Sequence, residues 1–334
     1  MAQLTRLYPS AAIPGILTPQ TQDVDFKKYI GKETNQASLE NNAVYMTSVT
    51  NINSQAAITQ QWKSEVSNQS YTMGQISAPV YMIQAFMQYD KQEMAQFAAI
   101  SNGVALPDFL ENLAKQAINQ RRHEGILYGF DPATDLNQGI LANATQSNLP
   151  ADSAGATSIT GYNPAELQQF LASVIRDVMN ASYGMLRPVV IASSPRVINY
   201  LTTIIVSLTQ SQLPGAGVDT VAGLLGRVME WLGAGKVEFV QDLTLQDDTN
   251  GDKIVFVARG MDEQSEQVSD ADSQNLVGTK NSIKFNTWVD KGPGLIPEQA
   301  PEVLGVYKRK FVFRMTPGVT LRSEAVRVVI APYA

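Results

Sequence analysis

His123 is the only histidine of the chain, so a serine–histidine–aspartate centre would have to use it. It follows Arg121 and Arg122 near the end of a stretch with helical spacing, where positive charge is favoured. No G-x-S-x-G pattern supplies a nucleophile at a strand-to-helix turn, and the chain has no cysteine to act as a nucleophile or thiolate ligand. We therefore predict an exposed or helix-capping role for His123 and no catalytic residues.

Two glycine-rich segments contain parts of nucleotide-binding loops without completing them. GAGVDT at 215–220 lacks the third glycine of a dinucleotide fingerprint and follows no clear strand. GAGK at 233–236 ends like a phosphate-binding loop, but Val237 stands where serine or threonine is required and Glu230 where the first glycine belongs. The chain is therefore predicted to bind no cofactor.

The acidic segment DDTNGD at 247–252 carries the residue types of a calcium loop. An EF-hand needs glycine at its sixth position and glutamate at its twelfth, and counting from either Asp247 or Asp248 fails both. Asn250-Gly251 is instead a strong signal for a β-hairpin turn between the flanking apolar runs. We predict a hairpin and no metal site.

Composition narrows the classes further. The chain has 334 residues, 44% of them hydrophobic, which is enough for a sizeable core. The net charge of −6 argues against affinity for nucleic acid driven by phosphate neutralisation. The N-terminus shows no signal-peptide pattern, and the apolar stretch 188–206 is a poor membrane span because it contains Pro188, Pro195, Arg196 and Asn199. We expect no membrane association.

The first 79 residues are predicted to be extended. Residues 1–40 contain Pro9, Pro14 and Pro19 with little apolar periodicity, which is typical of an arm. In 47–77, 18 residues are Asn, Gln, Ser or Thr, and only Lys63 and Glu65 are charged. A long polar β-hairpin resting on other chains is favoured; an ordinary solvated loop with edge strands is the alternative.

Next come a strand and a long helix. The apolar run 80–89 predicts a buried strand. Residues 107–127 have helical periodicity, and Asp108 with Glu111 matches a capping box. Glu111 and Lys115 form an i,i+4 pair on the polar face. The basic residues 121–123 fall in the predicted last turns of this helix.

The remainder mixes helices and strands without a regular βαβ rhythm, which predicts an α+β fold. Asn163, Pro164 and Glu166 mark the start of one helix, and Ser194-Pro195 marks another. Residues 187–192 read as a buried strand and 224–232 as a short helix. Strands dominate from residue 237 onward.

This order of elements resembles the Hong Kong 97-like fold of tailed-phage major capsid proteins. The turn after the long helix resembles Gly129-Phe130-Asp131 followed by Gln138-Gly139-Ile140-Leu141. The strand–proline–helix step of the family resembles VVIASSPRVINYL at 189–201, and its closing segment resembles 303–333. Each motif alone is weakly specific, but together they cover nearly the whole chain in order.

The resemblance implies five regions. They are an N-terminal arm at 1–40, an extended hairpin (E-loop) at 41–79, a peripheral P-domain with its spine helix at 80–145, an axial A-domain at 146–300, and a return to the P-domain at 301–334. It also implies a non-enzymatic protein that assembles with itself into hexamers and pentamers. These close an icosahedral virion shell in the host cytoplasm around double-stranded DNA that is not read by sequence. Scaffolding, portal and decoration proteins are the further partners that the family suggests.

Within this scheme, the candidates for contacts between subunits are Trp62, Lys63, Glu65, Tyr71, Arg121 and Arg122. Lys63 is the only lysine of the hairpin and so the only candidate for the lysine–asparagine crosslink that some members form. Three alternatives stay open: an encapsulin-type shell, disfavoured by the proline-rich start; a hydrolase built around His123; and a glycan-binding tail protein.

Overall fold

The chain divides into two units, which are described separately. In this computed structural model, unit 1 comprises 82–123 and 294–313, and unit 2 comprises 25–81, 124–293 and 314–334. The residues that the structure describes are 26–37, 40, 42–53, 70–100, 105–131, 139–142, 144–181, 190–206, 219–231, 237–259, 286–303 and 306–334. Among them, no helix combines the length and apolarity that crossing a bilayer requires.

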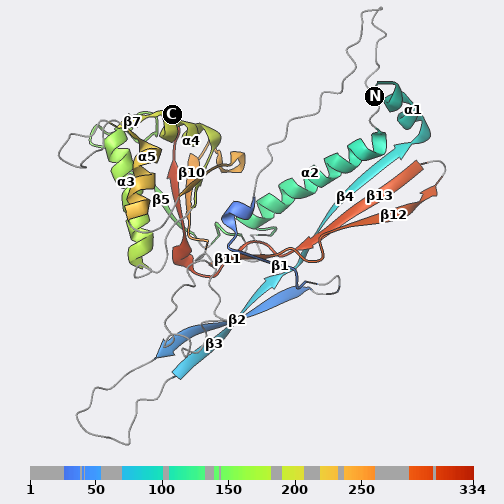
Figure 1. Ribbon diagram of the computed structural model, residues 1–334, viewed down its shortest axis with the longest axis horizontal. Coiled ribbons are helices and arrows are strands. Elements are labelled where there is room, and N and C mark those ends of the chain that lie inside the picture. Colours follow the sequence, from blue (N-terminus) through green and yellow to red (C-terminus); the bar gives the residue numbers. More distant parts are fainter. Residues whose placement is uncertain are drawn as a thin grey trace, which may run out of the picture. The chain divides into compact units, whose positions relative to one another are not determined.

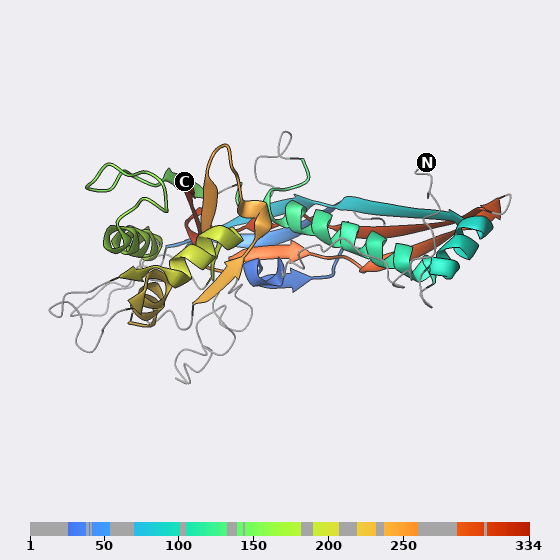
Figure 2. The same ribbon diagram turned by 90° about the horizontal axis from the view of Figure 1, so that it is seen from above.

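Unit 1 is built on a three-stranded sheet of order β12-β13-β4. Strands β12 (Leu295–Val303) and β13 (Val306–Met315) form an antiparallel pair, and β4 (Tyr81–Asp90) flanks β13. After β4 come the helices α1 (Lys91–Ile100) and α2 (Leu106–Leu127). Figure 2 shows α2 running along this sheet, so the long helix and the three strands extend side by side.

The long helix is confirmed, but its predicted start is wrong. Helix α2 begins at Leu106, two residues before Asp108, so Asp108 lies in the first turn rather than at the cap. The Glu111 carboxylate does not complete a capping box; it pairs with Lys115 at 2.8 Å, as predicted, and with Arg309 of β13 at 2.7 Å. The charges of this face therefore link α2 to the sheet.

The strand predicted at 80–89 is confirmed, but its predicted burial is wrong. Burial alternates along β4: Ile83 and Met87 are buried, whereas Phe86 is 72% exposed and Met82 is 43% exposed. Successive side chains of a strand point to opposite faces, and among the described residues only one face of β4 is covered. An apolar run in the sequence therefore indicates a strand that is buried on both faces only if other elements cover both of its faces.

Unit 2 contains a five-stranded sheet of order β5-β15-β10-β6-β9 and three helices (Figure 1). Its strands and helices are β5 (Thr145–Asn148), β6 (Val190–Ser193), β9 (Glu238–Gln241), β10 (Asp252–Val257), β15 (Val326–Ala331), α3 (Pro164–Ala181), α4 (Pro195–Thr203) and α5 (Val221–Trp231). The core between them is apolar and includes Leu167 of α3, Leu201 of α4, Leu225 of α5 and Phe256 of β10. This mixture confirms the α+β class.

Two helix starts follow local capping chemistry as predicted. The Asn163 side chain accepts a hydrogen bond from the Ala165 amide at the start of α3. Ser194 caps α4, accepting from the Val197 amide, with Pro195 in the first helical position. Both helices were therefore readable from a few neighbouring residues.

The hairpin predicted at 247–252 is wrong. A turn does occur there, with Gly251 at a φ of 98°, but the strands on either side of it are not neighbours. Strand β6 separates β9 from β10, pairing in parallel with the former and antiparallel with the latter. The Asn-Gly pair thus reverses the chain without choosing which strands become partners.

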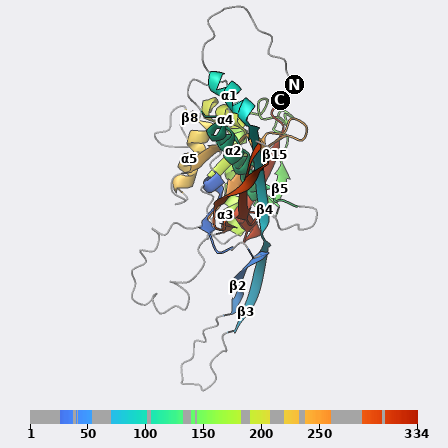
Figure 3. The same cartoon turned by 90° about the vertical axis from the view of Figure 1, so that its right-hand side faces the viewer.

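Smaller sheets complete unit 2. Strands β2 (Ala43–Asn53) and β3 (Ser70–Pro79) form the predicted antiparallel hairpin, which pairs with no other described strand (Figure 3). Strands β1 (Lys32–Thr34), β11 (Thr287–Asp290) and β14 (Val319–Thr320) form a three-stranded sheet, and β7 (Ile205–Val206) pairs with β8 (Asp219–Thr220).

The turn after α2 brings three backbone segments unusually close. The Gly139 amide donates to the Gly318 carbonyl at 2.8 Å, and the Ile140 amide donates to the Ile126 carbonyl at 2.8 Å. Gly139 has a φ of 92°. A Cβ atom built on Gly318 would lie 2.2 Å from the Ile126 carbonyl oxygen, so this crossing has no room for a side chain.

Candidate functional site

The predicted contact residues fall into two groups. Trp62, Lys63 and Glu65 lie outside the residues that the structure describes. Tyr71 lies on β3, where its backbone pairs with Ile52 of β2. Arg121 and Arg122 lie in the last turns of α2, as predicted, because the helix ends at Leu127. Their roles between subunits therefore stay predictions.

Within unit 1, Arg122 packs against its own sheet. Its guanidinium lies 4.2 Å from the centroid of the Phe313 ring, and it donates a hydrogen bond to the Asn119 side chain at 3.1 Å. A guanidinium over an aromatic face is attracted by the ring quadrupole. Arg121, in contrast, is exposed. Of the two arginines, Arg121 is the one whose side chain remains on the subunit surface.

The exposed or capping role predicted for His123 is wrong. His123 is only 2% exposed, because α2 continues for another turn and ends in the fully buried residues Ile126 and Leu127. The predicted end of the helix at residue 127 is correct, and the error concerns only the exposure of the His123 side chain. As a buried side chain, it belongs to the packing of the helix.

We expect His123→Ala to lower the free energy of unfolding by about 1–3 kcal/mol, because it removes a buried side chain and leaves a cavity. Urea unfolding followed by circular dichroism measures the loss. Arg121→Ala is the matched control on the neighbouring exposed position, with an expected change within about 0.5 kcal/mol. Equal effects of both variants would contradict the burial of His123.

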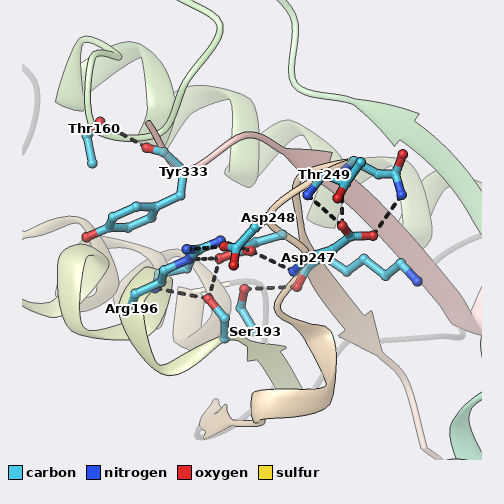
Figure 4. A network of polar contacts seen from close by, with 12 residues as sticks. Thr160, Ser193, Arg196, Asp247, Asp248, Thr249 and Tyr333 are labelled. Atoms are coloured by element: carbon cyan, nitrogen blue, oxygen red, sulfur yellow. Dashed lines mark hydrogen bonds and ion pairs between the residues drawn. The ribbon is translucent and has the colours of Figure 1, made fainter.

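A polar cluster of unit 2 surrounds Asp252 at the start of β10. Figure 4 shows this cluster, with Arg196, Asp247 and Asp248 labelled. Arg196 of α4 donates two hydrogen bonds to this carboxylate, from two guanidinium nitrogens, at 2.7 Å and 2.6 Å. The Ser194 hydroxyl donates to the same carboxylate at 2.5 Å, and the Asp247 amide donates at 3.0 Å. One buried carboxylate thus joins the start of α4, the 247–250 turn and β10.

The electrostatics of this network favour the charged form of Asp252. Burial alone would raise the pKa of Asp252, but hydrogen bonds from Arg196, Ser194 and the Asp247 amide, with the Arg196 charge, hold it below its usual value. Arg196 also pairs with Asp248 at 2.6 Å and lies 4.9 Å from the centroid of the Tyr333 ring. The hydrogen bonds that Arg196 donates to Asp252 and Asp248 in turn raise the pKa of Arg196.

This network is a structural brace. The Ser194 hydroxyl donates a hydrogen bond to the Asp252 carboxylate and accepts one from the Val197 amide, so it links the start of α4 to β10. Across the described part of the chain, no group of three or more metal-ligating side chains gathers. The sequence argument recognised Ser194 as a helix start but missed Asp252, whose only signal was an acidic residue directly before an apolar strand.

Large apolar side chains are exposed on β4 and on the β2–β3 hairpin. On β4, the side chains of Met82, Gln84, Phe86 and Gln88 alternate with the buried ones and are exposed; we call them the outer face of β4. Phe86 lies 5.8 Å from the Lys310 ammonium, which pairs with Glu298 at 3.6 Å. On the hairpin, Tyr45 is 62% exposed. Exposed aromatic side chains on extended strands are suited to contacts with other protein surfaces.

Comparisons with known proteins agree on the fold. No protein-family profile matches the chain, and no curated protein matches it. Among solved structures, the capsid of Myoviridae phage XM1 matches with a TM-score of 0.66 at 13% identity, covering 96% of each chain. A chain from Gordonia phage Cozz matches with a TM-score of 0.61 at 13% identity, covering 97% of this chain and 91% of the other. The capsid of a native GTA particle matches with a TM-score of 0.59 at 11% identity, covering 98% and 95%.

These matches run through both units and leave almost no part of the chain unaligned. The predicted α+β class and the predicted fold are therefore confirmed. The chain has the fold of tailed-phage major capsid proteins.

Proposed function

We propose that this chain is a major capsid protein that assembles with itself into hexamers and pentamers of an icosahedral shell enclosing double-stranded DNA. The observation that carries the proposal is the capsid fold over nearly the full length, with at least 91% of each compared chain covered. The function is association and not catalysis, and the location is the virion, after assembly in the host cytoplasm. Scaffolding, portal and decoration proteins are proposed as further partners.

The surfaces described above are consistent with association. A hairpin of two strands, which carries no charged residue in either strand, pairs only with itself among the described residues. The outer face of β4 exposes Phe86 and Met82. A specific protein–protein contact buries about 1,600 Å², and a subunit in a closed ring makes several. Exposed extended elements can supply such area while the subunit core stays unchanged.

We retain the five predicted regions as a proposal. In that proposal, the E-loop contains β2 and β3, the P-domain contains β4 and α2, and the A-domain contains β6, β9 and β10 of the five-stranded sheet. The closing segment 301–334 contributes to both units, because most of β13 lies in unit 1 and β15 pairs with β10 in unit 2.

Negative-stain electron microscopy of the purified recombinant chain tests the proposal directly. We expect closed particles or rings of five and six subunits, alone or after addition of a scaffold. A stable monomer with hydrolytic or glycan-binding activity under the same conditions would overturn it.

The tip of the hairpin is expected to matter for assembly and little for folding. Replacing residues 52–70 by a short Gly-Ser closure leaves the apolar base of the hairpin in place, and closing a loop of this length changes stability by only about 1 kcal/mol. We expect a soluble subunit with a cooperative melt that forms no shells. Size-exclusion chromatography beside thermal melting measures both properties. Normal shells would contradict the role of the hairpin, and an unfolded protein would place it in the core.

The outer face of β4 offers a point substitution. Phe86→Ser removes a ring that is 72% exposed, so we expect the stability of the subunit to change by less than about 0.5 kcal/mol while particle yield falls at least about tenfold. Leu243→Ser is the matched control, since Leu243 is 54% exposed in unit 2. Sedimentation measures the particle yield of each variant. An equal loss for Phe86→Ser and Leu243→Ser would mean that any exposed apolar side chain affects the yield, and that the outer face of β4 has no special role.

A further inference from the structure

Residues 26–37 cross unit 2 as a separate strip, which we call the strap. It consists of a 3-10 helix (Phe26–Tyr29) and β1, which pairs in parallel with β11 so that Thr34 lies opposite Asp290. Of the strap side chains that the structure describes, only Tyr29, Ile30 and Ala37 are buried. The strap is therefore held by means other than a large apolar surface.

The main tie is the carboxylate of Asp290, which is fully buried. It accepts hydrogen bonds from the Thr34 hydroxyl at 2.6 Å, the Gln36 amide at 2.7 Å and the Ala37 amide at 3.1 Å. Its fourth donor, the Gly292 amide, belongs to its own turn. Three of the four donors would thus leave together if the strap moved away.

The other end of the strap is tied in the same way. The Tyr29 hydroxyl donates to the buried Asp242 carboxylate at 2.7 Å. Thr287 donates to the Tyr29 carbonyl at 2.9 Å and accepts from the Gly31 amide at 2.8 Å. Lys28 forms an ion pair with Glu238 at 2.8 Å. Each of these contacts is a hydrogen bond or an ion pair. If the strap moves away, water can hydrate the side chains of Asp242, Thr287 and Glu238 that it contacts.

The strap leads directly into the hairpin. Ala37, its last residue, packs in a small apolar cluster with Val44 of β2, Ala78 of β3, Trp288 and Val319. The Trp288 indole donates to the Thr34 hydroxyl at 2.9 Å. The same few side chains therefore hold both the end of the strap and the base of the hairpin. The apolar cluster that joins α3, α4 and α5 to the five-stranded sheet includes no strap residue among its described members.

We propose that the strap is a releasable latch on the base of the β2–β3 hairpin. In the engaged state, Asp290 and Asp242 hold it and the hairpin base is fixed. In the released state, water replaces the strap donors, the cluster around Trp288 opens and the hairpin is free to change direction, while the five-stranded sheet stays folded. Hydrogen bonds and ion pairs of this kind hold the strap in one defined position. Water can replace them without unfolding of the apolar core. The inference concerns the isolated subunit and is independent of whether it assembles.

Hydrogen exchange measured by mass spectrometry on the full-length, unassembled subunit tests the latch. We expect the amides of Gly31, Gln36 and Ala37 to exchange at least about 100-fold faster than those of β10, because strap release does not require global unfolding. Asp290→Asn removes one of the acceptor oxygens and should speed exchange of the strap at least about tenfold further, with β10 unchanged. Equal exchange of the strap and β10 in the unmodified chain would overturn the proposal.

Asp152→Asn is the matched control. The Asp152 carboxylate also accepts several backbone amides, from Ala154, Ala156 and Asn163, but it holds a loop beside α3 rather than the strap. Its variant should leave exchange of the strap unchanged. If Asp290→Asn does not fold, Thr34→Val decides by the same criterion, since it removes only the hydroxyl between Trp288 and Asp290. Acceleration of the strap and β10 together in the folded variant would show one cooperative unit and refute the latch.

Discussion

Gly318→Ala is expected to prevent accumulation of folded subunit, with a loss of about 3–5 kcal/mol in the free energy of unfolding. The added Cβ would lie 2.2 Å from the Ile126 carbonyl oxygen and 2.9 Å from the Ile140 side chain. The nearer atom is backbone, so it cannot rotate away. Relief would require separating the segments of Gly318 and Ile126, which the hydrogen bond from the Gly318 amide to the Gly125 carbonyl links at 3.4 Å. The soluble fraction after expression and the urea midpoint measure the effect.

Gly155→Ala is the control for this substitution. Gly155 has a φ of 88°, so alanine is strained there, but no atom lies within 4 Å of the added Cβ. We expect a cost of about 1–2 kcal/mol from the backbone alone and a folded, soluble subunit. If Gly318→Ala cost no more than Gly155→Ala, the close approach of the backbones after α2 would be wrong.

Asp252→Asn is expected to lower the free energy of unfolding by about 2–4 kcal/mol. The Asp252 side chain is fully buried, and its loss of charge leaves the Arg196 guanidinium and the Ser194 hydroxyl facing an amide. Asp248→Asn changes the same arginine's other partner, which is 74% exposed, so we expect less than about 1 kcal/mol there. Equal effects from the two aspartates would contradict the picture of a buried brace.

The same pair of variants has a pH signature. Because the folded-state pKa of Asp252 lies below its usual value, the unfolded chain binds the proton more tightly. The stabilisation is complete above the unfolded pKa of about 3.9 and is lost as the pH falls from there through the folded pKa. Asp252→Asn should flatten this acid loss, whereas Asp248→Asn should leave most of it. Urea midpoints between about pH 5 and pH 2 give the comparison.

What could be predicted from the sequence depended on how local the determining chemistry is. The starts of α3 and α4 are set by a cap, a proline and one amide within four residues, and both predictions hold. The antiparallel pairing of β2 and β3 also holds, because one polar strand follows the other along the chain. The order of elements was sufficient to identify the capsid fold.

The failures all concern partners distant in the sequence. The Asn250-Gly251 turn is local, but β6, contributed by residues about 60 positions earlier, separates the strands that it connects. The apolar run of β4 could not reveal that only one of its faces is covered. His123 was correctly placed near the end of the helix, but the residues that bury its side chain could not be read from the local sequence. Nothing in 26–37 indicated that Asp290 would clamp it from 253–256 residues away.

Strand order in the five-stranded sheet has a consequence for synthesis. Strand β15, at 326–331, lies between β5 and β10, and β5 pairs with β15 alone. Until residues 326–331 have left the ribosome, β5 has no hydrogen-bonding neighbour, and β10 has only one. In a nascent chain, the facing edges of β5 and β10 are therefore unpaired, and the five-stranded sheet is complete only after β15 has been synthesised. A chain truncated before residue 326 would therefore lack both of the strand pairings that β15 makes.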